Sequence, residues 1–247
     1  MGVYLGSMGW SYKQWELFSG VRAGNYLSEY AMHFNSVEVN NTFYRIPKTS
    51  YVENWASRVP DGFRFAVKFP RGISHSSGLK ADQGMLEAFL SRMPLFGDKL
   101  GPLLIQLPST FKAHQSKGLE AFLGRPPLVN RSAVEFRHAS WFNEATYSIL
   151  KANEVALANV EPPSGPSSDV QTTDFTYIRL EGNRKTVKGE AGEAELDRAE
   201  DNIRWADRIS GLAENGRDVY CYLSKHYSGY PPGDISQINA ALGAKEL

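Results

Sequence analysis

The sequence predicts a single-domain α/β protein, spanning residues 1–247, with the (β/α)8 architecture of a TIM barrel. Three observations lead to this prediction. Eight short apolar runs recur along the chain, segments of helical periodicity lie between several of them, and the length is close to the roughly 250 residues typical of this fold. Alternating strands and helices favour parallel strand pairing with right-handed crossovers.

The predicted strands are rich in aliphatic and aromatic residues and are bounded by Gly, Pro, Asn or Ser. In chain order they are 3–8, 36–40, 63–68, 102–107, 132–136, 155–160, 176–180 and 218–223. Helical periodicity marks the segments 24–34, 81–95, 116–124 and 193–216. In the last of these, one apolar face is predicted to comprise Leu196, Ala199, Ile203, Ala206, Ile209 and Leu212. The segment 161–174 has no periodicity and is predicted to be a loop.

A doubly wound sheet is the alternative fold. That fold usually carries a glycine-rich phosphate-binding turn after its first strand, and the corresponding segment here, "GSMGWSY", does not match GxGxxG. The sequence also lacks Walker, CxxC, HExxH and GxSxG motifs. The barrel is therefore the favoured prediction.

Composition narrows the function classes. Lysine plus arginine equals aspartate plus glutamate at 27 each, so no overall field attracts nucleic acid or an anionic membrane surface. No apolar run approaches the roughly 20 residues that span a bilayer. The one cysteine, Cys221, cannot form an intrachain disulfide, which fits a reducing compartment. We expect a cytoplasmic protein with a small-molecule ligand and no membrane partner.

Polar side chains gather where the predicted strands end. The stretch "VEVNNTFYR", residues 37–45, begins as a buried strand and then presents Asn40, Tyr44 and Arg45 after Glu38. Because the carboxyl ends of barrel strands face a shared active site, such residues are predicted to line one pocket. Glu38 and Glu135 are candidate acid–base catalysts, and His75 and His138 are predicted to assist them.

Other residues at the strand ends are candidates for binding a ligand. Arg45, Lys68, Arg71, Arg137 and Arg179 suit an anion, because guanidinium groups grip phosphate or carboxylate. Asn40, Gln106 and His226 are further candidates for binding the substrate. Trp10, Tyr44 and Trp141 offer stacking faces for a sugar or base. The structural alternative is that Glu38, Glu135 and Glu181 pair with these cations and brace the barrel.

A metal site is an alternative that the spacing disfavours. His75, His138 and His226 all follow predicted strands, and imidazole with carboxylate suits zinc, iron or manganese. No two of these histidines stand at HxH or HxxxH spacing. No metal ligands are therefore assigned, and the sequence specifies no cofactor.

Several blocks of the sequence resemble the YecE-like family, which is catalogued as a domain of unknown function. The blocks are "GSMGWSYKQW", "FNSVEVNNTFYRIP", "FRFAVKFPRGISH", "LGPLLIQLPSTF", "AVEFRHASWF" and "YIRLEG". The resemblance covers nearly the whole chain and implies a TIM-barrel-like fold, sometimes distorted, without an established activity. The family-typical positions are Trp10, Glu38, Asn40, Phe43, Tyr44, Arg45, Lys68, His75, Gln106, Glu135, Arg137, His138, Trp141 and Arg179.

The chain departs from the family pattern at three places. "ISH" replaces the usual "ITH", "RLEG" stands where "RLHG" is common, and "LSKHYSG" lacks an amide pair before the last loop. Glu181 therefore replaces a ring nitrogen with a carboxylate. This change weakens the case for a histidine-based metal site.

Three functional hypotheses follow. The favoured one is an enzyme, a hydrolase or isomerase, that acts on a small anionic or sugar/phosphate-type substrate. The second is a barrel that binds a metabolite or partner without catalysis, since barrels host many roles. The third is nucleic-acid binding, which the zero net charge disfavours.

The stretch "AVEFRHASW" gives a testable expectation. Strict alternation places Glu135 and Arg137 on one face of the strand, pointing inward, and Phe136 and His138 on the other. If Glu135 is structural, Glu135→Gln is expected to destabilise the fold by about 1–3 kcal/mol. If it is functional, melting should barely change while ligand binding or turnover is lost. The sequence favours the functional role.

Overall fold

The strands form two parallel sheets in the computed structural model, which describes residues 2–125, 131–161 and 167–244. The first sheet has the order β1-β9-β8-β7, and the second has the order β2-β3-β4-β5-β6. The strands are β1 Val3–Ser7, β2 Ser36–Val39, β3 Arg64–Lys68, β4 Leu100–Gln106, β5 Ser132–Glu135, β6 Val155–Leu157, β7 Asn159–Val160, β8 Phe175–Leu180 and β9 Asp218–Leu223.

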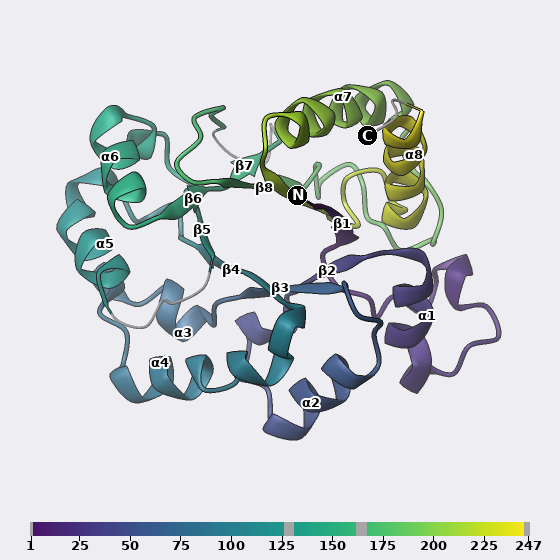
Figure 1. Cartoon of the computed structure of the whole chain (residues 1–247), viewed down its shortest axis with the longest axis horizontal. Helices are drawn as coiled ribbons and strands as arrows, with labels where there is room; N and C mark the ends of the chain where they lie inside the picture. Colours follow the sequence, from purple (N-terminus) through teal and green to yellow (C-terminus); the bar gives the residue numbers. More distant parts are fainter. Residues whose placement is uncertain (1, 126–130, 162–166, 245–247) are drawn as a thin grey trace.

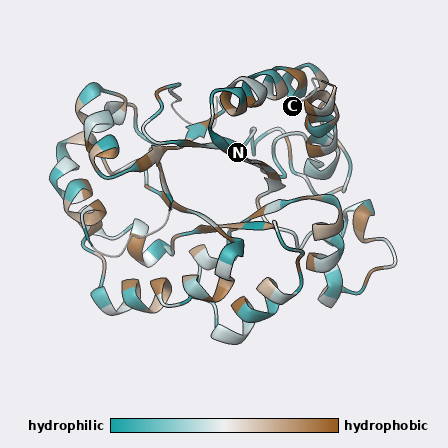
Figure 2. Cartoon of the chain, in the orientation of Figure 1, coloured by the Kyte–Doolittle hydropathy of each residue, from teal (hydrophilic) through white to brown (hydrophobic). Residues whose placement is uncertain are grey.

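Helices lie outside the strands, which together surround the centre of the molecule (Figure 1). The α-helices are α1 Tyr26–His33, α2 Thr49–Ser57, α3 Arg71–Ser74, α4 Gln83–Leu90, α5 Ser116–Leu123, α6 Glu144–Ala152, α7 Ala199–Glu214 and α8 Pro231–Gly243. Short 3-10 helices span Glu16–Phe18, Ala23–Asn25, Asn41–Phe43, Ser77–Leu79, Met93–Lys99, Ala113–Gln115 and Ala139–Trp141. Figure 2 shows hydrophobic residues along the strands and on the helix faces turned toward them.

The alternation of side chains along the strands divides the buried residues between two faces. Residues such as Val67, Ile105 and Val134 belong to the larger hydrophobic cluster that includes the helices. The opposite face contributes a smaller cluster in which Ala66 and Ala133 are members together with Leu104 and Tyr177. Lys68, Gln106, Glu135 and Arg179 each follow one of these inner residues by two positions. Strand periodicity therefore carries them to the inner face at the carboxyl ends of the strands.

The two sheets meet along the chain at Ala158. The predicted strand 155–160 is divided there into β6 and β7, which pair with β5 and β8 respectively. The N–H of Ala158 donates to the carbonyl of Val134 at 2.9 Å, so the chain leaves one sheet and enters the other within a single residue.

Side chains rather than a backbone ladder join β1 to β2. Asn35 accepts from the N–H of Leu5 at 3.0 Å and donates to the carbonyl of Val3 at 2.8 Å. The hydroxyl of Tyr30 accepts from the N–H of Ser7 at 2.8 Å and donates to the carbonyl of Ser36 at 3.0 Å. Within the residues that the structure describes, no strand pairing links β1 and β2. The predicted TIM-barrel-like fold is thus present as two parallel sheets, and among the described residues no strand pairing joins them into one ring.

Gly6 explains why the seam between β1 and β2 is narrow. A Cβ atom on Gly6 would lie 2.0 Å from the carbonyl oxygen of Ser36, which is far inside van der Waals contact. Glycine at this position permits the close approach of β1 to β2.

Most predicted elements exist, with shifted ends, but four α-helices were missed. The strand ends differ from prediction by at most two residues, apart from the break at Ala158. The segment 81–95 forms α4 and then a 3-10 helix, and α2, α3, α6 and α8 were not predicted. Of the predicted loop 161–174, residues 162–166 lie outside the described part, and 167–174 form neither helix nor strand.

The predicted apolar face of the 193–216 segment is partly wrong. Helix α7 begins only at Ala199, so Leu196 precedes it and is exposed, as is Ile203 within it. The buried residues of α7 include Asn202, Trp205 and Ile209. Asn202 donates to Asp234 and Gln237 of α8, and this polar contact turns the helix so that Ile203 faces solvent.

Two sequence-level points can be compared with the structure. Cys221 is free and fully buried in β9, and burial raises the pKa of its thiol, which disfavours a reactive thiolate. Over the described ranges, the structure contains no helix with both the length and the apolar character needed to cross a membrane.

Candidate functional site

A cavity of about 710 Å³ opens at the carboxyl ends of the strands. Residues from both sheets contribute to its wall, which is why the site depends on the whole fold. Its lining comprises Met8, Gly9, Trp10, Ser11, Tyr12, Asn40, Asn41, Phe43, Tyr44, Lys68, Arg71, His75, Gln106, Arg137, Arg179, Arg184, Ser224, Lys225 and His226.

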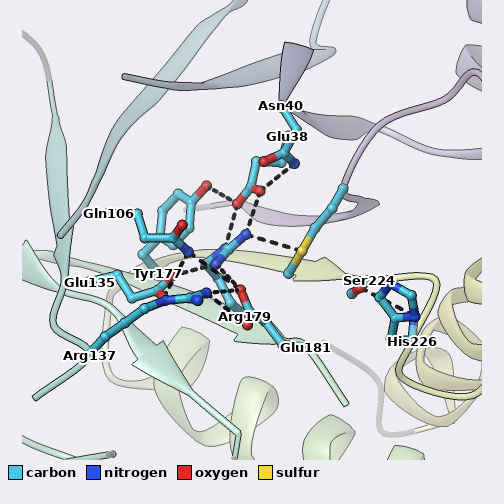
Figure 3. A network of polar contacts seen from close by, with 11 residues as sticks. Glu38, Asn40, Gln106, Glu135, Arg137, Tyr177, Arg179, Glu181, Ser224 and His226 are labelled. Atoms are coloured by element: carbon cyan, nitrogen blue, oxygen red, sulfur yellow. Dashed lines mark hydrogen bonds and ion pairs between the residues drawn. The ribbon is translucent and has the colours of Figure 1, made fainter. Parts of the chain in front are cut away.

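Arg179, in β8, is the centre of a buried network of charged side chains (Figure 3). Its Nε and Nη2 atoms donate to the two carboxylate oxygens of Glu38, each at 2.9 Å, in a bidentate pair. Its Nη1 atom donates to both Glu135 and Glu181. Because Arg179 is only 2% exposed, these partners must replace its entire hydration shell.

Arg137 forms the second half of the network. Its Nε atom donates to Glu135 at 2.7 Å, and its Nη2 atom donates to both carboxylate oxygens of Glu181 at 2.9 and 3.0 Å. Gln106 adds an amide donor to Glu135 at 2.8 Å. The prediction that Glu135 and Arg137 share the inward face is confirmed by these contacts.

Two further donors hold Glu38. The hydroxyl of Tyr177 donates to its Oε2 atom at 2.8 Å, and the amide of Asn40 donates to its Oε1 atom at 2.7 Å. Burial would raise the pKa of Glu38, but the charge of Arg179 and its hydrogen bonds outweigh burial, so the pKa is lowered. For Glu135 the same balance, with Arg179 and Arg137 as the opposing charges, lowers the pKa to about 2. Both groups are therefore ionised at neutral pH.

Lys68 lies beside this network, but it differs from Arg137 and Arg179 in its pKa and in its contacts. It is 7% exposed, and its Nζ atom lies 4.5 Å from the centroid of the Phe43 ring. Burial, together with the nearby charge of Arg179, lowers the pKa of Lys68 to about 8. None of the ion pairs between described residues involves its ammonium group.

Two histidines reach the cavity. The ring of His75 contacts the ring of Phe43, with 5.2 Å between centroids, and its Nδ1 atom lies 3.0 Å from the hydroxyl of Ser74. His226 donates from Nδ1 to the carbonyl of Val187 at 2.8 Å. Burial lowers the pKa of both rings, and for His75 the charges of Arg71, Lys68 and Arg137 lower it further. Both rings are therefore neutral at pH 7.

The predicted site residues fall into three groups. Trp10, Asn40, Tyr44, Lys68, His75, Gln106, Arg137, Arg179 and His226 line the cavity. Glu38 and Glu135 lie behind its wall, where they hold Arg179. His138, Trp141 and Arg45 do not line it. Their predicted roles, like those of the other site residues, stay predictions.

Local packing accounts for the residues that point elsewhere. Trp141 is fully buried between Phe111 and Phe136, and its indole N–H donates to the carbonyl of Phe111 at 2.7 Å. The Nδ1 atom of His138 accepts from the N–H of Ser140 at 3.1 Å and caps the 3-10 helix that follows β5. Because alternation continues past the strand, His138 turns away from the face that carries Arg137.

Arg45 lines a smaller, adjoining cavity of about 290 Å³. The two cavities share Trp10, Ser11 and Asn41. Within the described part of the chain, no group of three or more His, Cys, Asp or Glu residues is arranged to hold a metal ion.

Comparison with known proteins places the chain in a family. Residues 4–247 match the family model described as "Protein of unknown function DUF72". The chain belongs to the DUF72 family. The resemblance seen in the sequence blocks is thereby confirmed, since the curated relatives include UPF0759 protein YecE of Escherichia coli strain K12.

The curated relatives match the chain to different extents. YecE is 38% identical over 141 residues, which are 57% of this chain and 50% of YecE, so the match spans half the length of that relative. UPF0759 protein YunF of Bacillus subtilis is 24% identical over 257 residues, covering 92% of this chain and 90% of YunF.

Solved structures of DUF72 proteins share the fold. A family member from Thermotoga maritima superimposes with a TM-score of 0.82 at 25% identity, covering 98% of this chain and 100% of that one. A family member from Enterococcus faecalis gives a TM-score of 0.78 at 21% identity, covering 98% and 95% of the two chains. The parallel α/β arrangement is therefore a property of the DUF72 fold.

Sequence reasoning missed several members of the DUF72 site. Tyr177 stands two residues before Arg179 in the same predicted strand, so period-two alternation could have placed it on the inner face. Arg184 and Lys225 follow the last two predicted strands of the chain and line the cavity. Their position after strand ends was the available signal.

Proposed function

We propose that this DUF72 protein is an enzyme that binds a small anionic substrate of the sugar or phosphate type in the cavity of about 710 Å³. One observation carries the proposal. Six cationic side chains line the cavity, whereas among the described residues no aspartate or glutamate does. The six are Lys68, Arg71, Arg137, Arg179, Arg184 and Lys225.

The charges behind the wall do not cancel this excess. Glu38, Glu135 and Glu181 carry three negative charges. Two of these balance Arg137 and Arg179, and the third partly offsets the charge of Lys68 without direct contact. Arg71, Arg184 and Lys225 are left without an ion pair among the described residues. An incoming phosphate or carboxylate would supply the missing counter-charge, and each charge-assisted hydrogen bond is worth about 1.5–3 kcal/mol.

The depressed pKa values divide the roles within the site. Carboxylates as firmly ionised as Glu135 are poor proton donors near neutral pH, so we assign Glu38 and Glu135 to orienting Arg179 and Arg137. A neutral His75 on the cavity wall is better suited to accept a proton. This assignment moves the acid–base work from the predicted glutamates to one of the predicted histidines.

The position of the cavity supports an enzyme. Ligand sites of (β/α)8 barrels lie at the carboxyl ends of the strands, and this cavity lies at the carboxyl ends of both sheets. We therefore interpret the fold as a (β/α)8 barrel whose strand pairing, among the described residues, is interrupted between β1 and β2 and between β6 and β7. The fold alone assigns no chemistry, which makes binding the property to test first.

Calorimetric titration with inorganic phosphate and glucose 6-phosphate tests the proposal, with uncharged glucose as the reference ligand. Arg71→Ala and Lys225→Ala should each weaken binding of the phosphorylated ligand at least about tenfold, the equivalent of one lost charged contact. Arg22→Ala and Lys117→Ala remove exposed cations that lie outside the cavity and should leave binding unchanged. Equal losses from both pairs of variants would overturn the anion site.

Turnover measurements separate the enzyme from the alternatives. Products formed from phosphorylated sugars or keto acids support catalysis. Thermal stabilisation by these ligands without any turnover would favour a metabolite-binding protein. Binding of oligonucleotides that weakens steeply with salt, with no binding of small anions, would favour the nucleic-acid alternative.

A further inference from the structure

We infer that Lys68 is a nucleophile that forms a covalent imine with the carbonyl group of an anionic substrate bound in the cavity of about 710 Å³. The inference rests on the proposed anion-binding function and adds a substrate class to it, namely keto or aldehyde compounds that carry a phosphate or carboxylate. It also replaces the role of anion holder that the sequence suggested for Lys68.

The position of Lys68 meets the first requirement for such a reaction. It is the last residue of β3, on the inner face, and its side chain lines the cavity. A substrate carbonyl can therefore reach the amine, while the 7% exposure keeps bulk water away from it. Exclusion of water favours an imine over its hydrolysis.

The neighbours of Lys68 leave its amine uncommitted. Glu38 and Glu135 stand on β2 and β5, but their oxygens accept from Arg179, Arg137, Tyr177 and amide groups. The ammonium group of Lys68 lies over the face of the Phe43 ring, with its Nζ atom 4.5 Å from the ring centroid. A lysine that served only as a counter-ion would be expected to hold one of these carboxylates directly, as the two arginines do.

Charge and burial favour the neutral, reactive form of the amine. Burial and the positive charge of Arg179 lower its pKa to about 8, although Glu38, Glu135 and Glu181 act in the opposite direction. Arg71 and His75 lie on the same cavity wall. At pH 8 about half of the Lys68 side chains would be neutral. For an ordinary lysine of pKa about 10.4, the neutral fraction at this pH is below about 1%.

The remaining cavity groups fit the steps of imine formation. Arg71, Arg184 and Lys225 would hold the anionic end of the substrate. The neutral Nζ atom attacks the carbonyl carbon, a C–N bond forms, and the carbonyl oxygen takes a proton to become a hydroxyl group. Loss of that hydroxyl group as water gives the C=N bond, so that amine plus carbonyl yields imine plus water. His75, which contacts the same Phe43 ring as Lys68, would carry the protons between nitrogen and oxygen.

Borohydride trapping tests the inference directly. The protein is incubated with pyruvate, or with dihydroxyacetone phosphate, and sodium borohydride is added to reduce any imine to a stable secondary amine. Proteolysis and mass spectrometry then locate the adduct. We expect Lys68 to be labelled at least about tenfold faster than the exposed Lys117, with a rate that rises as the pH passes through about 8.

Two variants and one competitor complete the experiment. Lys68→Arg cannot form the imine, so the adduct should vanish. Lys117→Arg should leave the labelling of Lys68 unchanged. Lactate, which has the carboxylate of pyruvate without its keto group, should bind, prevent labelling and form no adduct.

The outcomes distinguish this inference from the proposed function. If phosphate and lactate bind but Lys68 is labelled no faster than Lys117, then Lys68 is not the nucleophile, and the proposed anion-binding site is still supported. If neither anion binds, the proposed function itself fails. The ratio of Lys68 to Lys117 labelling is measured in the protein without substitutions. The inference can therefore be tested even if the Lys68→Arg variant does not fold.

Discussion

Arg179 carries a buried positive charge that three glutamates share: Glu38 accepts from its Nε and Nη2 atoms, and Glu135 and Glu181 both accept from its Nη1 atom. Glu38 grips it in a bidentate pair, while Glu135 also joins it to Arg137. Removing one member of such a network leaves the others buried and under-compensated, which costs more than the interaction itself contributes. The stability of the fold and the geometry of the cavity wall are therefore linked through single residues.

Glu135→Gln should lower the free energy of unfolding by about 2–4 kcal/mol, measured by urea unfolding at pH 7. The new amide would offer one acceptor and one N–H₂ group to donors from Arg179, Arg137 and Gln106, so at least one donor would lose its partner. The exposed Glu120→Gln is the matched control and should change little. Unchanged unfolding with lost ligand binding would instead support the purely functional role that the sequence favoured.

The seam between β1 and β2 shows how two elements can adjoin without a backbone ladder. Tyr30 of α1 and Asn35, just before β2, provide the hydrogen bonds that a neighbouring strand would otherwise supply. Trp10, Ser11 and Tyr12 follow β1, and Asn40 and Asn41 follow β2, so this seam also sets one wall of the cavity.

Tyr30→Phe should therefore destabilise the protein by about 1–3 kcal/mol, because the N–H of Ser7 and the carbonyl of Ser36 lose a buried partner. Hydrogen exchange of the Ser7 amide should accelerate more than that of amides within β8. The matched control is Tyr51→Phe, whose hydroxyl is partly exposed and has no hydrogen bond among the described residues. Equal effects of the two changes would show that the seam does not depend on Tyr30.

At the scale of the whole molecule, the network makes stability depend on pH. The pKa of Glu135 in the folded protein is about 2, below its ordinary value of 4.5, so its ionised form is stabilised by folding. This contribution is fully present above pH 4.5 and is lost as the pH falls toward 2. Its size is on the order of 3 kcal/mol. The lowered pKa values of His75 and His226 act in the same direction, beginning near their ordinary value of 6.5.

We expect the free energy of unfolding, measured by urea titration at a series of pH values, to decrease below pH 4.5. In Glu135→Gln the decrease over this acidic range should be shallower, since the titrating carboxylate is gone. An identical slope in both proteins would show that Glu135 does not control the acid response. The contributions of His75 and His226 to the free energy of unfolding begin to change at higher pH than that of Glu135, which distinguishes them.

The sequence by itself determined the order of elements and the set of chemical groups at the strand ends. Apolar runs and period-two alternation were enough to place Glu135 and Arg137 on one face, and position after a strand predicted that Lys68 and His75 would share a cavity. Local patterns can do this because they reflect backbone geometry over a few residues. Helices α2, α3, α6 and α8 were not predicted. Two of them carry little helical periodicity, because α2 buries only Val52 and α3 spans four residues.

Only the tertiary structure decided which charges meet. Glu38 and Arg179 are 141 residues apart in the chain, and no local pattern relates them. Arg179 and Arg137 occupy the three glutamates, so Lys68 has no direct carboxylate partner among the described residues, and burial together with the charge of Arg179 lowers its pKa. Likewise, packing of Trp141 between two phenylalanines removed it from the cavity. The physical reason is that burial and Coulomb interactions act through space, so their balance is fixed only when distant strands are brought together.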